Sequence, residues 1–179
     1  TGSSFTLHIA PGSFRGAEIV GLLGENGCGK TTFMEMMAGQ YDKKEGDGGI
    51  DDETAKHSLA ARGVSYKRQN YAPRLRKFPG TVQDLFEKAI QQVCADRLFR
   101  LLVLRPLKVE ELEKLQVKHL SGGELQRVAI VLCLGMPATI YLLDAPPAGL
   151  DCEQRGAASK VIRRRAVAPL PKTADVIEH

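Results

Sequence analysis

Hydrophobic positions repeat every second residue in some stretches of the chain and about every 3.6 residues in others, which predicts strands alternating with helices. The alternating residues 5–9 and the apolar run at 18–23 predict the first two strands. Short apolar segments at 64–66 and 140–144 predict two more, and the second of these is expected to be fully buried. The run at 174–178 predicts a last strand.

Helical spacing separates these strands. A helix is expected to begin near Thr31, and Thr81 is expected to cap a helix over about 81–94, because Asp84 occupies the capping-box position. Further helices are predicted near 110–115, 122–134 and 153–165. Strands alternating with helices indicate an α/β fold with a parallel sheet flanked by helices, interrupted by a mostly helical subdomain inserted at 71–135.

Length and composition are ordinary for one globular domain. The 179 residues are expected to form a single unit over 1–179, incomplete at its C-terminus and cut from a longer polypeptide. The glycine-rich and polar residues 41–62 predict a variable loop. The longest apolar runs fall far short of a membrane span, so any contact with a membrane is expected to need a partner.

Charge and cysteine content narrow the function only a little. The formal net charge is +4, with basic clusters at Arg74-Arg76-Lys77 and Arg163-Arg164-Arg165. These clusters are either solvated faces or contacts with nucleic acid or the ribosome, and both interpretations stay open. Four cysteines lack the paired spacing of zinc or redox sites, so we expect buried or free thiols in a reducing compartment. They are Cys28, Cys94, Cys133 and Cys152.

The glycine-rich segment after the second predicted strand carries the first chemical motif. Residues 24–31 read GENGCGKT, which matches the phosphate-loop pattern between a strand and a helix. Its glycines allow successive amide groups to form an anion-binding nest at a helix N-terminus. We expect Lys30 to reach the outer phosphates and Thr31 to offer its hydroxyl to Mg²⁺. The predicted nucleotide-binding residues are Gly24, Glu25, Asn26, Gly27, Cys28, Gly29, Lys30, Thr31 and Thr32.

A second motif stands at the end of the predicted strand at 140–144. Asp144 is a costly carboxylate at a buried strand end unless a cation or hydrogen-bond donor accompanies it, so a role as Mg²⁺ ligand beside Thr31 is predicted. In phosphate-loop hydrolases of this kind the next residue is usually a glutamate that activates water, but here it is Ala145. Because a methyl group accepts no proton, we expect ATP binding with slow or absent hydrolysis.

The segment LSGGELQR at 120–127 matches the signature of the ATP-binding-cassette (ABC) class, which the chain therefore resembles in two motifs in the right order. The resemblance implies that Ser121, Gly122, Gly123 and Glu124 act in trans on the γ-phosphate of ATP held by an opposite cassette. A Ser-Gly-Gly turn at a helix start presents the backbone donors that such a contact needs. The resemblance also assigns Gln69 to Mg²⁺ and the attacking water, and His179 to the switch histidine.

Within that class, several blocks are similar to the second cassette of the E-subfamily ATPases that split and recycle ribosomes, also called ribonuclease L inhibitors. These blocks are GENGCGKTTF, VSYKRQ, LSGGELQRVA and PATIYLLDAPPAGLDCEQR. The resemblance implies ATP and Mg²⁺ as cofactors and a second cassette in the same parent chain. It also implies the ribosomal small subunit, translation factors and ribosomal RNA as partners in the cytoplasm, with no membrane. Where relatives have Pro-Ser after the glutamate this chain has Pro146-Pro147, and Arg68 replaces a proline before Gln69.

Two other functions remain open on the sequence alone. The chain could be the motor domain of an ABC transporter, because the signature occurs in several branches of the class. It could also be a regulatory cassette that binds ATP without hydrolysing it, which Ala145 favours.

Overall fold

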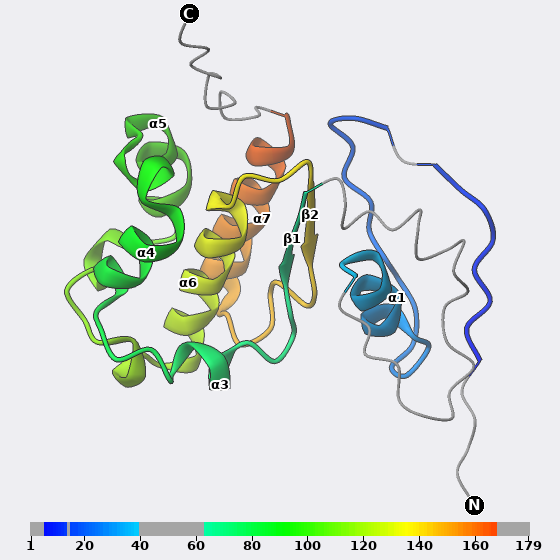
Figure 1. Cartoon of the computed structure of the whole chain (residues 1–179), viewed down its shortest axis with the longest axis horizontal. Coiled ribbons are helices and arrows are strands. Elements are labelled where there is room, and N and C mark those ends of the chain that lie inside the picture. The colour runs from blue at the N-terminus through cyan, green and yellow to red at the C-terminus, as the bar shows by residue number, and fades with distance from the viewer. Residues whose placement is uncertain (1–5, 14, 40–62, 168–179) are drawn as a thin grey trace, which may run out of the picture.

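The computed structural model describes residues 6–13, 15–39 and 63–167. Its sheet consists of two parallel strands, β1 (Val64–Lys67) and β2 (Ile140–Leu143). Val64 pairs with Ile140 and Lys67 with Leu143, so the carboxyl ends of both strands lie at the same edge (Figure 1). Both predicted strands are confirmed. The expectation that the second is fully buried is wrong, because only Leu142 is buried and the other three residues are half-buried.

The strands predicted at 5–9 and 18–23 are a second correction. Residue 5 lies outside the described residues, and neither 6–9 nor 18–23 forms a strand. Ile19 remains 52% exposed and Leu23 95% exposed. A strand requires a ladder partner, and β2 pairs only with β1 among the residues that the structure describes. The strand predicted at 174–178 and the loop predicted at 41–62 lie outside the described residues.

Helices make up most of the described structure. The long ones are α1 (Lys30–Met37), α4 (Val82–Ala95), α6 (Gly122–Gly135) and α7 (Cys152–Val167). Shorter turns are α3 (Ala72–Leu75), α5 (Arg97–Phe99), η2 (Arg100–Leu104), η3 (Glu110–Leu112) and η4 (Val117–His119). Every helix between α3 and α6 in the chain lies between β1 and β2. The helices expected from near Thr31 and over 81–94, 122–134 and 153–165 are confirmed.

The helix expected at 110–115 is only a three-residue 3₁₀ turn, η3. The reason is that the next carbonyls bond elsewhere. The carbonyl of Glu113 accepts from the amide of Gln83 at 2.9 Å, and that of Leu115 accepts from Val82 at 3.0 Å. These bonds draw the chain toward the start of α4. The amides of Glu113 and Leu115 also reach back only three residues, to Glu110 and Leu112, which is the 3₁₀ pattern and not the α-helical one.

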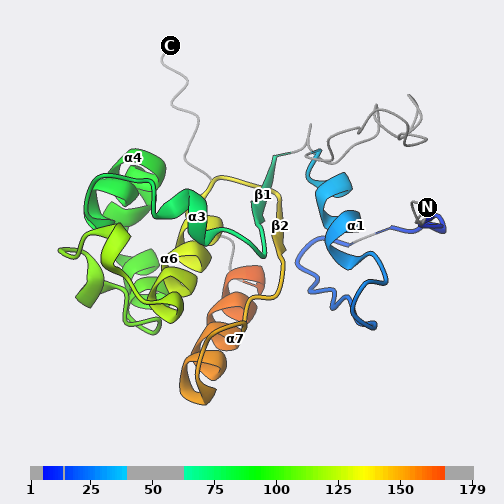
Figure 2. The same cartoon turned by 90° about the horizontal axis from the view of Figure 1, so that it is seen from below.

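Helix α6 lies at the centre of the molecule. It contacts α3, α4, α7 and both strands (Figures 1 and 2). Ten of its fourteen residues are buried, so no polar face remains along most of its length. Its first turn carries the segment predicted to contact nucleotide, and a core helix therefore holds that segment in place.

Helix α4 begins as the capping box predicts. The amide of Asp84 donates to Thr81 Oγ1 at 3.2 Å, and the amide of Thr81 donates to Asp84 Oδ2 at 2.8 Å. The bond from the Thr81 amide, together with one from Thr81 Oγ1 at 2.8 Å, stabilises the charged form and holds the pKa of the Asp84 carboxyl below its ordinary value.

Two helical glycines allow a matched test of the packing. A Cβ at Gly135 would lie 2.8 Å from Ile90 Cδ1, whereas a Cβ at Gly156 meets nothing within 4 Å. We expect Gly135→Ala to lower the free energy of unfolding by about 1–3 kcal/mol through overpacking between α6 and α4. Gly156→Ala is expected to raise it by roughly 0.5–1 kcal/mol, because alanine favours the helix. Urea denaturation of both variants measures the difference, and equal effects would contradict this account of the packing.

All four cysteines are free thiols, as expected. Cys28 and Cys152 are exposed, Cys94 is half-buried and Cys133 is buried. In the described ranges, no three His, Cys, Asp or Glu side chains gather in a way that could hold a metal ion. None of the helices described is both long enough and apolar enough to cross a lipid bilayer.

Candidate nucleotide site

The phosphate loop at residues 24–31 folds around the ammonium group of Lys30. Lys30 Nζ donates to the carbonyl of Gly24 at 2.8 Å and to that of Glu25 at 2.6 Å. Gly27 and Gly29 have φ values of 85° and 96°, which a side chain would resist. Helix α1 begins directly after Gly29, so the first amides of the helix and the loop amides belong to one continuous turn.

The structure brings together two predicted Mg²⁺ ligands that are 113 residues apart. Thr31 Oγ1 donates to Asp144 Oδ2 at 2.7 Å, which joins the first turn of α1 to the carboxyl end of β2. Asp144 is only 7% exposed. A hydroxyl and a carboxylate are the hard oxygen ligands that Mg²⁺ accepts, usually together with water and phosphate oxygens. The donor set therefore fits a magnesium ion bound with a nucleotide.

Two neighbours of Asp144, Lys67 and Tyr66, belong to β1 and were not predicted from the sequence. Lys67 is buried, and its Nζ donates to the backbone carbonyl of Asp144 at 3.0 Å and lies 4.8 Å from the centre of the Tyr71 ring. Burial lowers the pKa of Lys67 to about 8. Burial and the nearby Asp144 carboxylate raise the pKa of Tyr66 to about 12, so this phenol stays protonated. The sequence held no signal for Lys67, because the apolar Val64 and Tyr66 alternate with Ser65 and Lys67, yet it is the polar pair that is buried.

The residues predicted for catalysis are placed unequally. Ala145 follows Asp144 with a φ of 46°, at the start of the turn that leaves β2. Gln69 lies in an exposed bend two residues beyond β1, at the same edge of the sheet, but it makes no hydrogen bond to Thr31 or Asp144. His179 lies outside the described residues. The structure therefore joins Thr31 to Asp144 by a hydrogen bond, and Gln69 has no such bond to either residue.

The signature segment begins α6 through a second capping box. The amide of Glu124 donates to Ser121 Oγ at 3.3 Å, and the amide of Ser121 donates to Glu124 Oε2 at 2.8 Å. The bond that the Ser121 amide donates to the carboxylate holds the pKa of the Glu124 carboxyl below its ordinary value. Ser121 and Gly122 are exposed, so their polar groups face outward at the positive end of a helix dipole.

Arg76 fixes the chain just before the signature. Its guanidinium donates to the carbonyl of Lys118 and to that of Leu120, both at 3.0 Å. One member of the cluster Arg74-Arg76-Lys77 thus has a structural role that the sequence did not reveal. The partners are backbone carbonyls, which carry no sequence signal.

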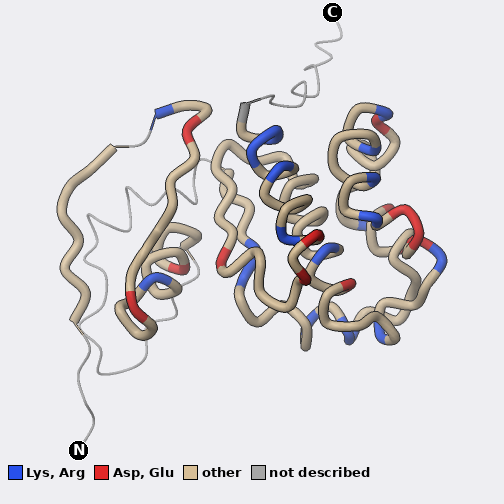
Figure 3. The backbone as a smooth tube through the Cα atoms, turned by 180° about the vertical axis from the view of Figure 1, so that it is seen from behind, with Lys and Arg blue, Asp and Glu red and all other residues tan. Residues whose placement is uncertain are grey.

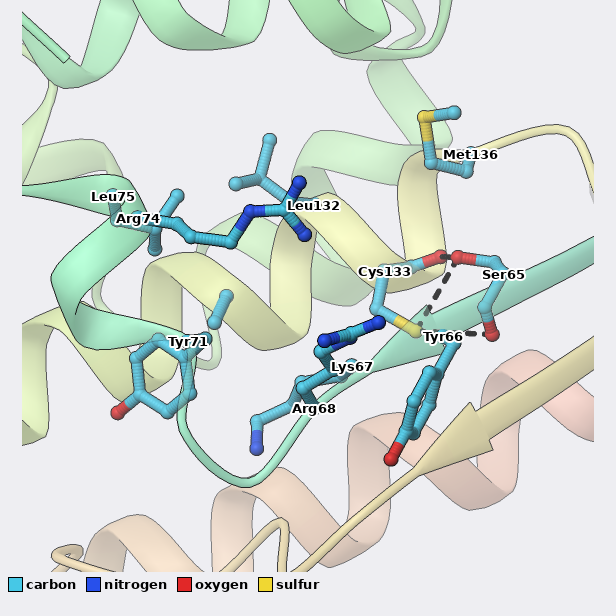
Figure 4. Close-up of a pocket in the computed structure, with 11 residues that line it drawn as sticks. Ser65, Tyr66, Lys67, Arg68, Tyr71, Arg74, Leu75, Leu132, Cys133 and Met136 are labelled. Atoms are coloured by element: carbon cyan, nitrogen blue, oxygen red, sulfur yellow. Dashed lines mark hydrogen bonds between the residues drawn. The ribbon is translucent and has the colours of Figure 1, made fainter. Parts of the chain in front are cut away.

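A pocket of about 280 Å³ lies beside β1, between α3 and α6. Ser65, Lys67, Tyr71 and Cys133 belong to its wall, and Ser65 Oγ donates to the Cys133 carbonyl at 2.8 Å (Figure 4). No residue of the phosphate loop lines it. The pocket therefore adjoins the nucleotide site through Tyr66 and Lys67. The nucleotide site itself is an open surface formed by a loop, a helix start and a strand end.

In the basic cluster Arg163-Arg164-Arg165 on α7, too, one arginine has a structural role. Arg165 donates to the Leu134 carbonyl at 3.3 Å and to Tyr141 Oη at 2.6 Å, so it joins α7 to α6 and β2. Arg163 and Arg164 are exposed and make no ion pair within the described ranges. Figure 3 shows that Lys and Arg residues recur along α7.

The phosphate loop contains its own chemical reporter. Cys28 is exposed, and its Sγ lies 3.6 Å from Lys30 Nζ. We expect N-ethylmaleimide to alkylate Cys28 and thereby to block nucleotide binding, because the adduct occupies space beside the ammonium group. Saturating MgATP is expected to slow this alkylation at least about tenfold, since occupancy of 90% leaves a tenth of the sites open. Mass spectrometry of the peptide measures the rate. Cys152 is the control, and equal protection of both thiols would contradict this placement of the nucleotide.

Known proteins share both the sequence and the geometry. The model of the ABC transporter family matches residues 7–148. Translation initiation factor RLI1 of Saccharomyces cerevisiae is 45% identical over all of this chain, which spans 27% of that relative. ABC transporter E family member 3 of Arabidopsis thaliana is 47% identical over 165 residues, which are 92% of this chain and 87% of the relative.

Solved structures of similar proteins superpose on this chain. A structure titled RNase-L Inhibitor superposes with a TM-score of 0.70 and 39% identity, over 85% of this chain and 27% of the other. The complex of archaeal ribosomal stalk protein aP1 with archaeal ribosome recycling factor aABCE1 gives a TM-score of 0.71 and 38% identity, over 86% of this chain and 27% of the other. With the phosphate loop, the signature segment and a family match over most of its length, the chain belongs to the ABC transporter family.

Proposed function

We propose that this chain is an ATP-binding cassette that holds MgATP on residues 24–32. The observation that carries the proposal is the contact of 2.7 Å between Thr31 and Asp144 beside the phosphate loop. Lys30, now bonded to loop carbonyls, exchanges them for phosphate oxygens when nucleotide binds. Bound Mg²⁺ neutralises phosphate charge, and Thr31, Asp144 and, by family resemblance, Gln69 are its proposed protein ligands.

The cassette acts as half of a pair. We assign residues 1–179 to one nucleotide-binding domain, with the helical region 71–135 as its signature subdomain. The exposed groups of Ser121 and Gly122 at the start of α6 are suited to a phosphate presented by another molecule or domain. Gly123 and Glu124 complete this surface. A second cassette in the same parent protein is the proposed partner, since relatives such as RLI1 are several times longer than this chain.

The parent protein is proposed to act in the cytoplasm in ribosomal subunit splitting and translation. The support is the similarity to translation initiation factor RLI1 and to the archaeal ribosome recycling factor in complex with a ribosomal stalk protein. In this role, closure of two cassettes on MgATP drives binding to the small subunit. The exposed Arg163 and Arg164 are proposed as a contact for ribosomal RNA, because exposed cations that make no ion pair in the described part of the chain attract phosphate.

A regulatory cassette without turnover is a second candidate. Ala145 favours it, because no carboxylate follows Asp144 to activate water. Closure on ATP would then act as a clamp, and subunit release would depend on another site. This candidate and the first one share every contact of the nucleotide site and differ only in the rate of hydrolysis.

Co-sedimentation of the full-length protein with small ribosomal subunits tests the proposed function. We expect binding with a non-hydrolysable ATP analogue and little binding without nucleotide. Lys30→Ala is the control that removes nucleotide while leaving Arg163 and Arg164 in place. Binding that is absent under both conditions would overturn the ribosomal role while leaving ATP binding untouched.

A further inference from the structure

We infer that Gln126 is a positioning residue that couples the two nucleotide sites to which this chain contributes. One site is its own, at Thr31 and Asp144, and the other is the site of the opposite cassette, which the signature segment contacts. The inference rests on the proposed pairing of cassettes and names the side chain that links the two sites within this chain.

The first observation is a buried amide with two acceptors. Gln126 is 1% exposed, and its Nε2 donates to the carbonyl of Ala145 at 3.1 Å and to that of Pro146 at 2.6 Å. The two hydrogens of one amide thus bind two successive carbonyls of the chain just after Asp144. In a water-excluded interior such bonds fix geometry, because breaking them leaves polar groups without solvent.

The turn that these bonds hold is itself compact. The amide of Ala148 donates back to the Ala145 carbonyl at 3.1 Å, and the amide of Leu150 donates to the Pro147 carbonyl at 3.2 Å. Ala145 adopts a left-handed φ of 46°, a conformation that persists only when its surroundings impose it. The two bonds from Gln126 help to impose this conformation. The backbone at position 145, where a glutamate usually stands, is therefore held by a side chain of α6.

A second contact joins the same two segments independently. A Cβ on Gly123 would lie 3.2 Å from the carbonyl oxygen of Gly149. The signature glycine therefore lies directly against the far end of the turn that begins at Ala145. The signature segment touches this turn at two points, one through a backbone approach and one through Gln126.

Ser121 and Gln126 lie close together along α6. Ser121 caps the helix and Gln126 follows five residues later, roughly 7.5 Å along the axis at about 1.5 Å per residue. The capping box and the buried body of α6 make this first stretch rigid. A displacement of Ser121 by the opposite nucleotide is thus transmitted to the carbonyls of Ala145 and Pro146, beside Asp144.

A double-mutant cycle in the full-length protein tests the coupling. Protection of Cys28 from N-ethylmaleimide by the MgATP analogue AMP-PNP reports occupancy of this chain's own site. We expect Ser121→Ala to weaken that protection about fivefold, because it removes a contact to the opposite nucleotide. In a Gln126→Met background the same change is expected to have no further effect. A merely destabilising substitution would lower occupancy without removing the dependence on Ser121.

The control and the outcomes separate the two claims. Gln83→Met makes the same replacement on the exposed face of α4, so the effect of Ser121→Ala must persist there. Gln126→Asn, one methylene shorter, replaces Gln126→Met if the latter does not fold. A fivefold effect of Ser121→Ala that survives in both Gln126 variants overturns the role of Gln126, while the coupling of the two sites stands. No effect of Ser121→Ala in the otherwise unchanged protein overturns the coupling of the two sites, while protection of Cys28 by AMP-PNP in that protein leaves the proposed nucleotide binding in place.

Discussion

Ala145→Glu is expected to raise the rate of ATP hydrolysis by about 10²- to 10⁴-fold, which corresponds to roughly 3 to 5 kcal/mol of barrier. The new carboxylate would extend from the residue after Asp144, beside the proposed Mg²⁺ ligands. It supplies the proton acceptor that a methyl group lacks. The left-handed φ of 46° is already tolerated by a residue with a Cβ, so glutamate adds little backbone strain.

Phosphate release by the full-length protein measures this effect, and Ala145→Gln is the matched control. Glutamine has nearly the same shape but accepts no proton at neutral pH. The difference between the two variants also cancels turnover in the other cassette. Equal rates in the two variants would show that the chain is limited by a step other than water activation.

Lys30→Ala is expected to weaken MgATP binding to this chain at least about 100-fold, equivalent to roughly 3 kcal/mol. Its ammonium is the cation of the phosphate loop, and alanine leaves the phosphate charge without a charge-assisted hydrogen bond. Calorimetric titration of the chain with MgATP measures the dissociation constant. Lys88→Ala, which removes an exposed lysine of α4, is expected to bind normally. A loss below tenfold for Lys30→Ala would place the nucleotide elsewhere.

The parts of the fold that depend on neighbouring residues could be predicted from the sequence. The capping residues Thr81 and Ser121 each lie three positions before a carboxylate, and both helices begin where this spacing predicts. The phosphate loop precedes α1 for the same local reason. Strands are different, because pairing is non-local. Residues 18–23 have the composition of a buried strand, yet no strand pairs with them in the described part of the chain.

Some residues of the candidate site could likewise be predicted from the sequence, and others could not. Thr31 and Asp144 could be expected to meet, since a buried carboxylate at a strand end needs a donor or a cation. Lys67, Arg76 and Gln126 could not be assigned, because each binds backbone carbonyls that every residue possesses. Only burial and three-dimensional proximity identify such contacts.

The different environments of the four thiols make the unmodified chain suitable for measurements of motion. Burial raises the pKa of the Cys94 thiol to about 11 and also raises that of Cys133, so neither forms much reactive thiolate at neutral pH. Cys28 in the phosphate loop and Cys152 at the start of α7 are exposed. Because an adduct on Cys28 blocks nucleotide binding, labelling with MgATP present would direct one environment-sensitive dye to Cys152. The emission of that dye would report how the surroundings of α7 change when nucleotide is exchanged, without any engineered cysteine.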